Sequence, residues 1–443
     1  RSLNPGNYIQ IKNNKVTIKE YWSQKKFFLQ NKKDKGENYY LEKLEDLLKS
    51  SVKYRLISDV KVASLLSGGL DSSLITTIMQ QKIGKNSLAF SIGYDQKNYN
   101  EFEYSKFISK KLGIKHRIIH SNAEEYFDDL DELISLRGQP LTIPNEASQY
   151  RLCKEIKKEA TVVLSGSGAD ELFCGYGRIF GSADDYDKIL NLQSFSNKNK
   201  KIFLNNVKRR YGKIKFKNSL DHFLSLYRYT KNDLKKKILS RNFNHQKIEK
   251  NINKYFQDLC DNSELSNYLD KMQYIFQKYH LKGILEREDN SSMASSIELR
   301  VPFLDHRLVE FAATIPNKFK IHNITKKISL TSDLTSEVHD ITKYILRKSH
   351  EKFLPKKIYQ RKKIGFPVPL HSWMKQKKIK DRICDTLMSS NAKSKDFLDK
   401  KYINFLLKNE NLNFRGSSKV YQNSNASKLW VCYNLEKFFS LKF

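Results

Sequence analysis

The sequence lacks the residue patterns that mark several classes of protein. Its five cysteines include no Cys-x-x-Cys pair, and no histidine cluster has a metal-ligand spacing, so neither a disulfide framework nor a zinc site is predicted. No apolar run approaches the roughly eighteen residues of a membrane span, and the polar start has no signal-peptide core. These absences predict a soluble protein of a reducing compartment, the cytoplasm.

Positive charge is what the sequence has in excess. Lys and Arg number 81 against 48 Asp and Glu, which gives a formal net charge of +33. Such an excess would by itself favour a nucleic-acid partner. Lysines are, however, dense along nearly the whole chain and not only in 198–217. We therefore interpret the charge as a solvated surface of biased composition, and nucleic-acid binding is disfavoured.

Three segments differ in their residue patterns. Residues 1–40 contain β-prone runs separated by Pro5-Gly6 and Asn13-Asn14, which predicts a hairpin-like lead-in. Residues 41–180 alternate apolar runs with amphipathic stretches, which predicts a twisted parallel sheet with flanking crossover helices, an α/β fold. Residues 181–443 show amphipathic helical patterns and predict a mostly helical C-terminal lobe. Within the first 180 residues, strands are expected at 60–66, 87–92, 115–119 and 161–164, and helices at 39–56, 72–81, 101–112, 123–136 and 146–158.

The stretch Ser67–Ser73, SGGLDSS, follows the first of these strands and precedes a helix. Two adjacent glycines allow the backbone to approach an anion, and the helix N-terminus directs N–H groups and its positive dipole end toward that anion. The Gly-Lys-Ser/Thr ending of a Walker A loop is missing, so transfer of a γ-phosphate is disfavoured. Asp71 is explained if Mg²⁺ lies between its carboxylate and a phosphate, although an ordinary helix N-cap is the simpler alternative.

A second glycine-rich loop follows the last predicted strand. Gly166 and Gly168 begin like a dinucleotide-binding fingerprint, but the third glycine is absent. Asp170 and Glu171 would repel a pyrophosphate unless a metal or an ammonium group lay between them. The loop therefore favours a second carboxylate facing Mg²⁺, Asp170, over a Rossmann site.

Four motifs in this order resemble one known family. LLSGGLDSS, LSGSGADELFCGY, DNSSMASSIELRVPFLDHRL and RKKIGFPVPLHSW are spread from residue 65 to residue 373 and are similar to the synthetase domain of glutamine-hydrolysing asparagine synthetases. β-Lactam synthetases and lasso-peptide cyclases share this domain. The opening LNPGNYIQI resembles the connector that follows the glutaminase domain in that family. Taken without the resemblance, the stretch 289–305 would be a packed helix and turn with Glu298 and Arg300 paired.

The resemblance implies an ATP-pyrophosphatase fold, of the adenine nucleotide alpha hydrolase type, and a reaction in two steps. A substrate carboxylate attacks the α-phosphate of ATP and releases pyrophosphate, and ammonia then displaces AMP to form an amide. Aspartate is the default carboxylate, giving asparagine, and a sugar acid of a surface polysaccharide is the alternative. ATP and Mg²⁺ are the implied cosubstrate and metal. A tRNA-modifying enzyme with the same type of loop and a catalytically silent homologue are the competing interpretations.

The resemblance also implies roles for individual residues. ATP and its pyrophosphate portion would be bound by Leu65, Ser67, Gly68, Gly69, Asp71, Ser72, Ile92, Ser165 and Gly166. Asp71 and Asp170 would hold Mg²⁺. Asp170 and Lys363 would be catalytic, and Lys363 would stabilise charge at the reacting phosphate and during amide formation. In a chain this rich in lysine, the assignment of Lys363 depends on Arg361 and on Gly365-Phe366 around it.

Two departures from the family pattern affect the second step. Asparagine synthetases usually have Glu between the glycines of the second loop, whereas this sequence has Ser167. A hydroxyl cannot act as the same base as a carboxylate, so Ser167 leaves the acceptor and the nucleophile open while adenylation is retained. No cysteine is placed to begin a glutaminase domain, so we expect a piece of a longer chain, with ammonia from a glutaminase domain or subunit. Homodimer formation stays open.

Overall fold

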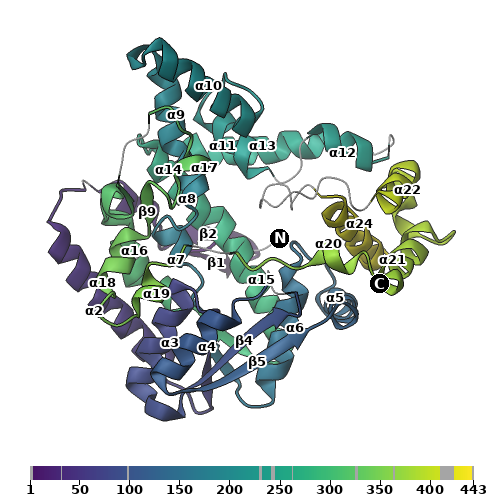
Figure 1. Cartoon of the computed structure of the whole chain (residues 1–443), viewed down its shortest axis with the longest axis horizontal. Helices are drawn as coiled ribbons and strands as arrows, with labels where there is room; N and C mark the ends of the chain where they lie inside the picture. The colour runs from purple at the N-terminus through teal and green to yellow at the C-terminus, as the bar shows by residue number, and fades with distance from the viewer. Residues whose placement is uncertain are drawn as a thin grey trace.

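The fold contains a five-stranded parallel sheet, whose strands β4 and β5 are labelled in the lower part of Figure 1. The computed structural model describes residues 3–30, 32–96, 99–228, 232–240, 245–261, 263–324, 328–362, 365–409 and 424–441. The strand order is β5-β4-β3-β6-β7, and every neighbouring pair is parallel. The bounds are β3 Val62–Leu65, β4 Leu88–Tyr94, β5 Lys115–Ser121, β6 Val162–Leu164 and β7 Glu298–Arg300.

Side chains that alternate along the strands build two separate apolar layers. Ala63, Phe90 and Val163 pack on one face of the sheet with α6. Ala89 and Leu164 belong to the layer on the other face, with α2, α3 and α4. Burial on both faces explains why the strands have nearly continuous apolar runs. The covering helices are α2 (Glu37–Arg55), α3 (Leu70–Ile83) and α4 (Phe102–Leu112) on one side and α6 (Asn145–Lys157) and α15 (Leu281–Met293) on the other.

The predicted α/β alternation is confirmed up to residue 180, because each expected strand and helix is present with its ends shifted by a few residues. The fifth strand was missed. β7 comes from the segment that we expected to be a helix and turn, and it pairs with β6 through Val162↔Glu298 and Leu164↔Arg300. The expected ion pair between Glu298 and Arg300 is present at 2.6 Å within this strand. Three residues carry too little periodicity to indicate a strand, and pairing with β6 decides their conformation.

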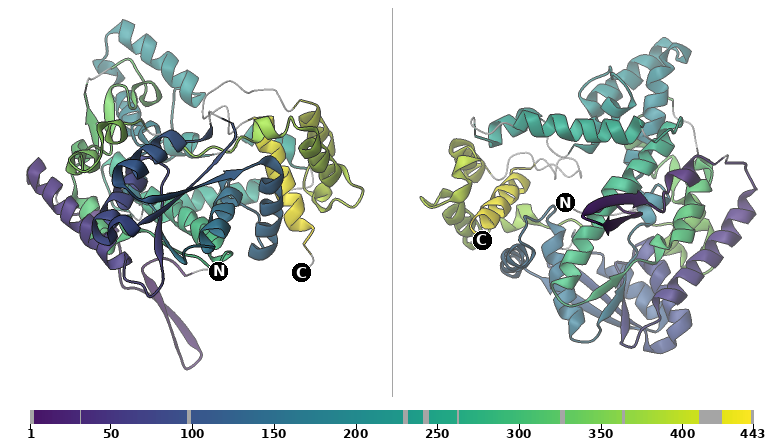
Figure 2. Two further views of the ribbon diagram at one scale, coloured as in Figure 1. Left: turned by 60° about the horizontal axis from the view of Figure 1, so that its bottom comes forward. Right: turned by 180° about the vertical axis from the view of Figure 1, so that it is seen from behind.

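The predicted hairpin at the start of the chain is also present. β1 (Asn7–Lys12) and β2 (Lys15–Glu20) are antiparallel and joined by Asn13 and Asn14, whose φ angles are +50° and +57°. Asparagine tolerates this left-handed region better than most residues, as a two-residue hairpin turn requires. The hairpin projects from the body of the molecule (Figure 2, left), and most of its side chains are exposed.

Helices make up most of the chain beyond the second glycine-rich loop. Most of those that precede α15 share an apolar cluster that contains Phe180, Phe223 and Phe276, and those nearest the C-terminus form another cluster with α5 (Ala123–Arg137). Two short strands, β8 (Ile321–Asn323) and β9 (Asp340–Thr342), pair between them. No helix in the described part of the chain is long and apolar enough to cross a membrane.

The bounds of the remaining helices are α1 Lys25–Phe28, α7 Ala169–Leu172, α8 Gly177–Phe180, α9 Ser182–Leu190, α10 Asn197–Tyr211, α11 Ser219–Tyr227, α12 Asn232–Ile238, α13 His245–Asp261, α14 Tyr268–Ile275, α16 His306–Thr314, α17 Ser332–Thr335, α18 Tyr344–Ser349, α19 Lys356–Tyr359, α20 Leu370–Trp373, α21 Lys377–Met388, α22 Lys400–Lys408 and α24 Asn425–Phe439. A π-helical turn, Phe276–His280, joins α14 to α15 without a break.

Candidate active site

A cavity of about 1070 Å³ opens at the carboxyl ends of β3, β4 and β6. This is the edge of a parallel α/β sheet where ligands bind. The cavity brings together nearly all of the residues that the sequence assigned to nucleotide and acceptor, namely Leu65, Ser67, Gly69, Asp71, Ser72, Ile92, Ser165, Gly166, Ser167 and Asp170. Gly68 belongs to the same loop but is not part of the lining. Lys363 lies outside the described residues.

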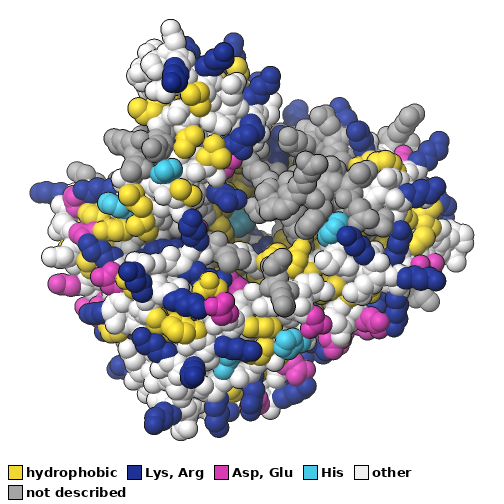
Figure 3. Space-filling view, in the orientation of Figure 1, with side chains coloured by type: hydrophobic (Ala, Val, Ile, Leu, Met, Phe, Trp, Pro, Cys, Tyr) yellow, Lys and Arg dark blue, Asp and Glu magenta, His cyan; other side chains and the backbone are white. Residues whose placement is uncertain are grey.

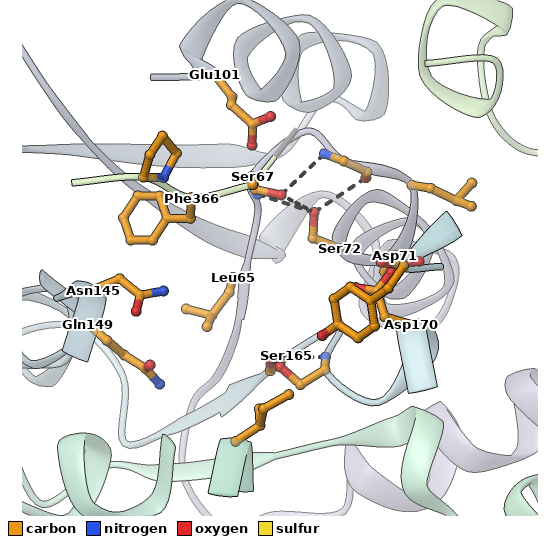
Figure 4. A pocket seen from close by; sticks show the side chains of 18 of the residues that line it. Leu65, Ser67, Asp71, Ser72, Glu101, Asn145, Gln149, Ser165, Asp170 and Phe366 are labelled. Carbon is orange, nitrogen blue, oxygen red and sulfur yellow. Dashed lines mark hydrogen bonds between the residues drawn. The ribbon is translucent and has the colours of Figure 1, made fainter. Parts of the chain in front are cut away.

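Hydrogen bonds within the first glycine-rich loop hold it in a tight turn (Figure 4). The hydroxyl of Ser72 accepts from the Ser67 N–H at 3.2 Å and lies 2.9 Å from the Ser67 hydroxyl. The Ser67 hydroxyl in turn accepts from the Gly69 N–H at 3.2 Å. The loop leads directly into α3, whose N-terminus therefore faces the cavity, as an anion site requires.

Two glycines of this region cannot be replaced without moving backbone. Gly68 has φ +77°, and a Cβ there would lie 2.5 Å from the Ser105 nitrogen. A Cβ on Gly166 would lie 2.9 Å from the Ser72 nitrogen, because the second loop crosses closely over the start of α3. The glycines therefore serve turn formation in one loop and close contact between the loops in the other.

Lys343 connects the two carboxylates that the sequence assigned to Mg²⁺. Its Nζ lies 2.6 Å from Asp71 Oδ2 and 2.7 Å from Asp170 Oδ1. Lys343 is only 4% exposed and has a left-handed backbone, with φ +52°. Burial disfavours its charge, but Asp170 and then Asp71 outweigh this effect and raise its pKa above the usual lysine value. The structure thus brings Asp71 and Asp170 together around one positive charge.

This arrangement fits a cation-binding role for the two aspartates. Asp71 is the second residue of α3 and Asp170 the second residue of α7, so both carboxylates lie just beyond the ends of neighbouring strands. A Cβ on Gly175 would overlap both the Asp170 carboxylate and the Lys343 side chain. The ion pair between Asp170 and Lys343 therefore fits only because residue 175 has no side chain. Two carboxylates with phosphate oxygens and water are a suitable ligand set for Mg²⁺.

The RKKIGF segment reaches the first loop through its arginine. One terminal nitrogen of Arg361 donates to the Gly68 carbonyl at 3.0 Å, and the other forms an ion pair with Glu101. The guanidinium also lies 3.7 Å from the centre of the Tyr104 ring. On the other side of the undescribed Lys363, Phe366 stacks on Tyr94 with ring centres 5.8 Å apart. Both flanks of the predicted catalytic lysine are therefore held at the cavity.

In another part of the cavity lining, called the acceptor end below, Ser167 pairs with a residue distant in sequence. Its hydroxyl donates to Glu288 of α15 and lies 3.0 Å from the Ser165 hydroxyl. Burial raises the pKa of Glu288 to about 7, although the Ser167 hydrogen bond and the charge of Arg287 act in the opposite direction. A carboxylate is thus present beside Ser167 but comes from a helix instead of the loop.

The lining around Glu288 is aromatic and charged. Tyr176, Tyr227, His280 and Arg287 line the same cavity as Glu288. The Tyr176 hydroxyl donates to the buried carboxylate of Glu171 at 2.6 Å. Because aromatic rings and an arginine surround it, this end can accommodate a ring-bearing or anionic acceptor.

Sequence reasoning missed two residues of the cavity, Lys343 and Glu288. Lys343 is one of 81 basic residues and has no local pattern that distinguishes it. Glu288 directly precedes the motif that begins at Asp289, so its neighbourhood was recognised but its role was not. Glu288 could have been recognised as a carboxylate close to that motif in a chain that has Ser167 in place of the family's loop Glu.

The fold and the loops together define a nucleotide-binding α/β protein of the ATP-pyrophosphatase class. The chain belongs to the asparagine synthase family, whose family model, described as asparagine synthase, matches residues 43–440.

Two similar proteins are asparagine synthetases [glutamine-hydrolyzing] 1 and 3 of Bacillus subtilis (strain 168). The first is 29% identical over 99% of this chain and 66% of its own length, and the second is 26% identical over 94% and 62%. The chain therefore spans less than two thirds of the length of these relatives. An NH3-dependent NAD synthetase from Campylobacter jejuni subsp. jejuni NCTC 11168 aligns in structure over 32% of this chain and 61% of its own, with 23% identity and a TM-score of 0.23, too low to support any conclusion.

Proposed function

We propose that the chain is an ATP-dependent ligase that adenylates a carboxylate, releases pyrophosphate and then forms an amide as ammonia displaces AMP. The observation that carries this proposal is the cluster of Asp71, Asp170 and Lys343 between two glycine-rich loops in one cavity. Aspartate is the first candidate acceptor, in keeping with the family. The expected compartment is the cytoplasm, in line with the five free cysteines.

The first glycine-rich loop would bind the phosphates. Ser67, Gly69 and Ser72 present backbone and hydroxyl groups at the start of α3, and Leu65 and Ile92 line the same cavity from strand positions, where the adenosine would lie. Asp71 and Asp170 would hold Mg²⁺. When bound, the metal would supply positive charge to the leaving pyrophosphate.

Lys343 would keep the two aspartates ionised and correctly spaced, since its ammonium group contacts both of them. Lys363, the family lysine, would add positive charge near the α-phosphate. Arg361 supports this assignment because it ties the segment to the Gly68 carbonyl. These groups would act on charge that develops on the phosphates, which is the largest contribution that such a site can make.

A direct test measures exchange of labelled pyrophosphate into ATP, and AMP release, with Mg²⁺, ammonium and a panel of carboxylates. The protein should be used in its full natural chain. Exchange that depends on one carboxylate supports adenylation, and an amide of the same carboxylate supports the whole proposal. Lack of exchange with every carboxylate would refute it.

A carboxylate-bearing sugar is the second candidate acceptor. Ser167 in place of Glu, together with Tyr176, Tyr227, His280 and Arg287 at the acceptor end, favours a larger anionic acceptor than aspartate. The panel should therefore contain glucuronate and galacturonate beside aspartate and glutamate. A tRNA substrate is less well supported, because Lys and Arg are scattered over the face in Figure 3, with acidic groups between them, instead of forming one patch.

A further inference from the structure

The contact between Ser167 and Glu288 places a carboxylate beside the residue that departs from the family pattern in the second glycine-rich loop. Ser167 stands where the resemblance implied a loop carboxylate, and its hydroxyl donates to Glu288 Oε1. The second carboxyl oxygen, Oε2, is shielded from solvent and receives no hydrogen bond from the described residues. A buried carboxyl oxygen without a donor costs stability, so a functional reason for it is expected.

The groups that influence Glu288 come from two other helices, from the loop that carries Ser167 and from its own helix. Arg287 is the neighbouring cation on α15, the charge of Glu171 on α7 adds to the rise in the pKa of Glu288, and Cys153 of α6 is affected by the charge of Glu288. Burial has the largest effect and raises the pKa of Glu288 to about 7. At neutral pH the carboxyl is thus divided between its two forms, as an efficient proton acceptor requires.

The helix that carries Glu288 is itself unusual at the cavity. α15 continues from the π-helical turn Phe276–His280, and both end residues of that turn line the cavity. Such turns are frequent at functional sites because they redirect the side chains that follow. Glu288 lies two helical turns beyond His280 and lines the same cavity.

We propose that Glu288, oriented by Ser167, is the carboxylate that receives the nitrogen nucleophile in place of the missing loop Glu. This inference rests on the proposed function. Glu288 would be a catalytic residue, because it contacts the attacking nitrogen, and Ser167 would be a positioning residue, because it acts through Glu288.

The step balances without any further reactant. The nitrogen lone pair of ammonia forms the bond to the acyl carbon, and the bond from that carbon to the phosphate oxygen breaks. AMP leaves with the electron pair of that bond. The proton that the nitrogen must lose passes to the Glu288 carboxylate and from there to water.

The first experiment compares both half-reactions in Glu288→Gln, which keeps the shape and removes the charge. With the carboxylate that the panel identifies, pyrophosphate exchange should stay within about threefold of the wild type, while amide formation falls about 100-fold or more. Ser167→Ala should reduce amide formation about tenfold and move the midpoint of its pH profile. Glu286→Gln is the matched control on the same helix, and its amide formation should equal that of the wild type.

The second experiment does not require a known acceptor. The carboxyl of Glu288 is followed by NMR in protein labelled with ¹³C-glutamate and assigned by its absence in Glu288→Gln. Ammonium chloride is the probe. After ammonia has attacked the acyl carbon, its nitrogen is positively charged until it loses a proton, and ammonium resembles this charged nitrogen. Ammonium should lower the titration midpoint of this carboxyl by about one pH unit, and tetramethylammonium chloride at equal ionic strength should not.

The outcomes separate the two proposals. Lack of exchange by the wild type with every carboxylate refutes the proposed function, and the NMR titration still decides whether Glu288 receives ammonium. An unchanged midpoint in ammonium refutes the role of Glu288, as does amide formation by Glu288→Gln at the wild-type rate. Equal loss of exchange and amide formation in Glu288→Gln would also refute it, because the residue would then support the fold or adenylation. If Glu288→Gln does not fold, the pH profile of Ser167→Ala decides instead, and an unshifted midpoint in that profile refutes the role of Glu288.

Discussion

Two parts of the cavity lining, the proposed nucleotide end and the acceptor end, are built in different ways. At the nucleotide end, Ser67, Gly69 and Ser72 lie within six residues of chain and hold each other by hydrogen bonds. At the acceptor end, Ser167 contacts Glu288, which lies on a helix 121 residues further along the chain. The nucleotide end can therefore be recognised from a local motif, whereas the acceptor end is assembled only by folding.

This difference separates phosphate binding, which the proposed reaction always needs, from the choice of acceptor and nucleophile, which can vary. Binding of phosphates requires backbone groups and a helix N-terminus, which a short loop supplies. Choice of acceptor and nucleophile requires side chains from several elements, which can be exchanged independently. Four predictions test this division, and they follow in order of decreasing effect.

Replacing Asp71 by Asn should abolish the nucleotide half-reaction. The variant loses one of two carboxylates around Lys343, and we expect pyrophosphate exchange to fall about 1000-fold, a loss typical of removing a key electrostatic group. Asp59→Asn, at an exposed position just before β3, is the control and should keep full exchange. Exchange above a tenth of the wild-type rate in Asp71→Asn would contradict the assignment.

Replacing Lys343 by Met should leave Asp71 and Asp170 facing each other without their cation. We expect exchange to fall about 100-fold and the free energy of unfolding to fall by about 3 kcal/mol, as when one partner of a buried ion pair is removed. Mg²⁺ should raise the melting temperature of this variant more than that of the wild type, because it can replace the lost charge. Thermal unfolding with and without Mg²⁺ measures this difference.

The buried Lys320 offers a matched control for that experiment. Its Nζ donates to Gln273 Oε1 at 2.6 Å, neither residue lines the cavity, and burial lowers the pKa of Lys320 to about 7. Lys320→Met should keep exchange and show no added stabilisation by Mg²⁺. Equal responses of the two variants to Mg²⁺ would contradict the cation-site interpretation.

Replacing Arg361 by Lys should weaken the nucleotide end without removing its charge. A lysine lacks the forked guanidinium whose two terminal nitrogens contact the Gly68 carbonyl and Glu101, so we expect the KM for ATP to rise about tenfold. Steady-state kinetics with saturating carboxylate measures it. Lys357→Met, which removes an exposed ion pair with Glu103, should leave this KM unchanged, and an unchanged KM in Arg361→Lys would remove the arginine from the site.

The smallest effect concerns stability at the acceptor end. The pKa of Glu288 is raised from 4.5 to about 7 in the folded protein, so the folded state binds more protons than the unfolded state between these pH values. Stability should therefore fall as the pH rises through this range. Glu288→Gln removes the penalty, so its melting temperature should exceed that of the wild type by a few degrees at pH 8 and equal it near pH 4.5.

Differential scanning fluorimetry at a series of pH values tests this prediction. Glu286→Gln changes an exposed side chain and should follow the wild type at every pH. A stabilising effect of Glu288→Gln that does not depend on pH would mean that packing and not ionisation is responsible.

The sequence predicted the strand, loop and helix of the proposed nucleotide end well because their signals are local. The apolar run before Ser67, the paired glycines and the helical spacing after Asp71 each depend on near neighbours, and the structure has them as expected. β7 was missed because its conformation depends on hydrogen bonds to β6. Lys343 was missed for a similar reason, since only folding brings its ammonium group to Asp71 and Asp170.

The acceptor end could be predicted only as a departure from a pattern. Ser167 was recognised as unusual, but nothing near it in the chain indicates the element that supplies its partner. Such contacts between distant residues depend on how α15 packs beside α6, which no periodicity encodes. The assignment of Lys363 stays a prediction, supported by the positions of Arg361 and Phe366.

The pairing of β3 with β6 has a consequence for how this site could be altered. These strands are hydrogen-bonded neighbours, so the loops that follow them start one strand spacing apart, about 4.8 Å. The pairing of these strands therefore sets the distance between Asp71 and Asp170. Side chains of the acceptor end can be substituted one at a time, whereas a different distance between the two aspartates would require a different strand arrangement.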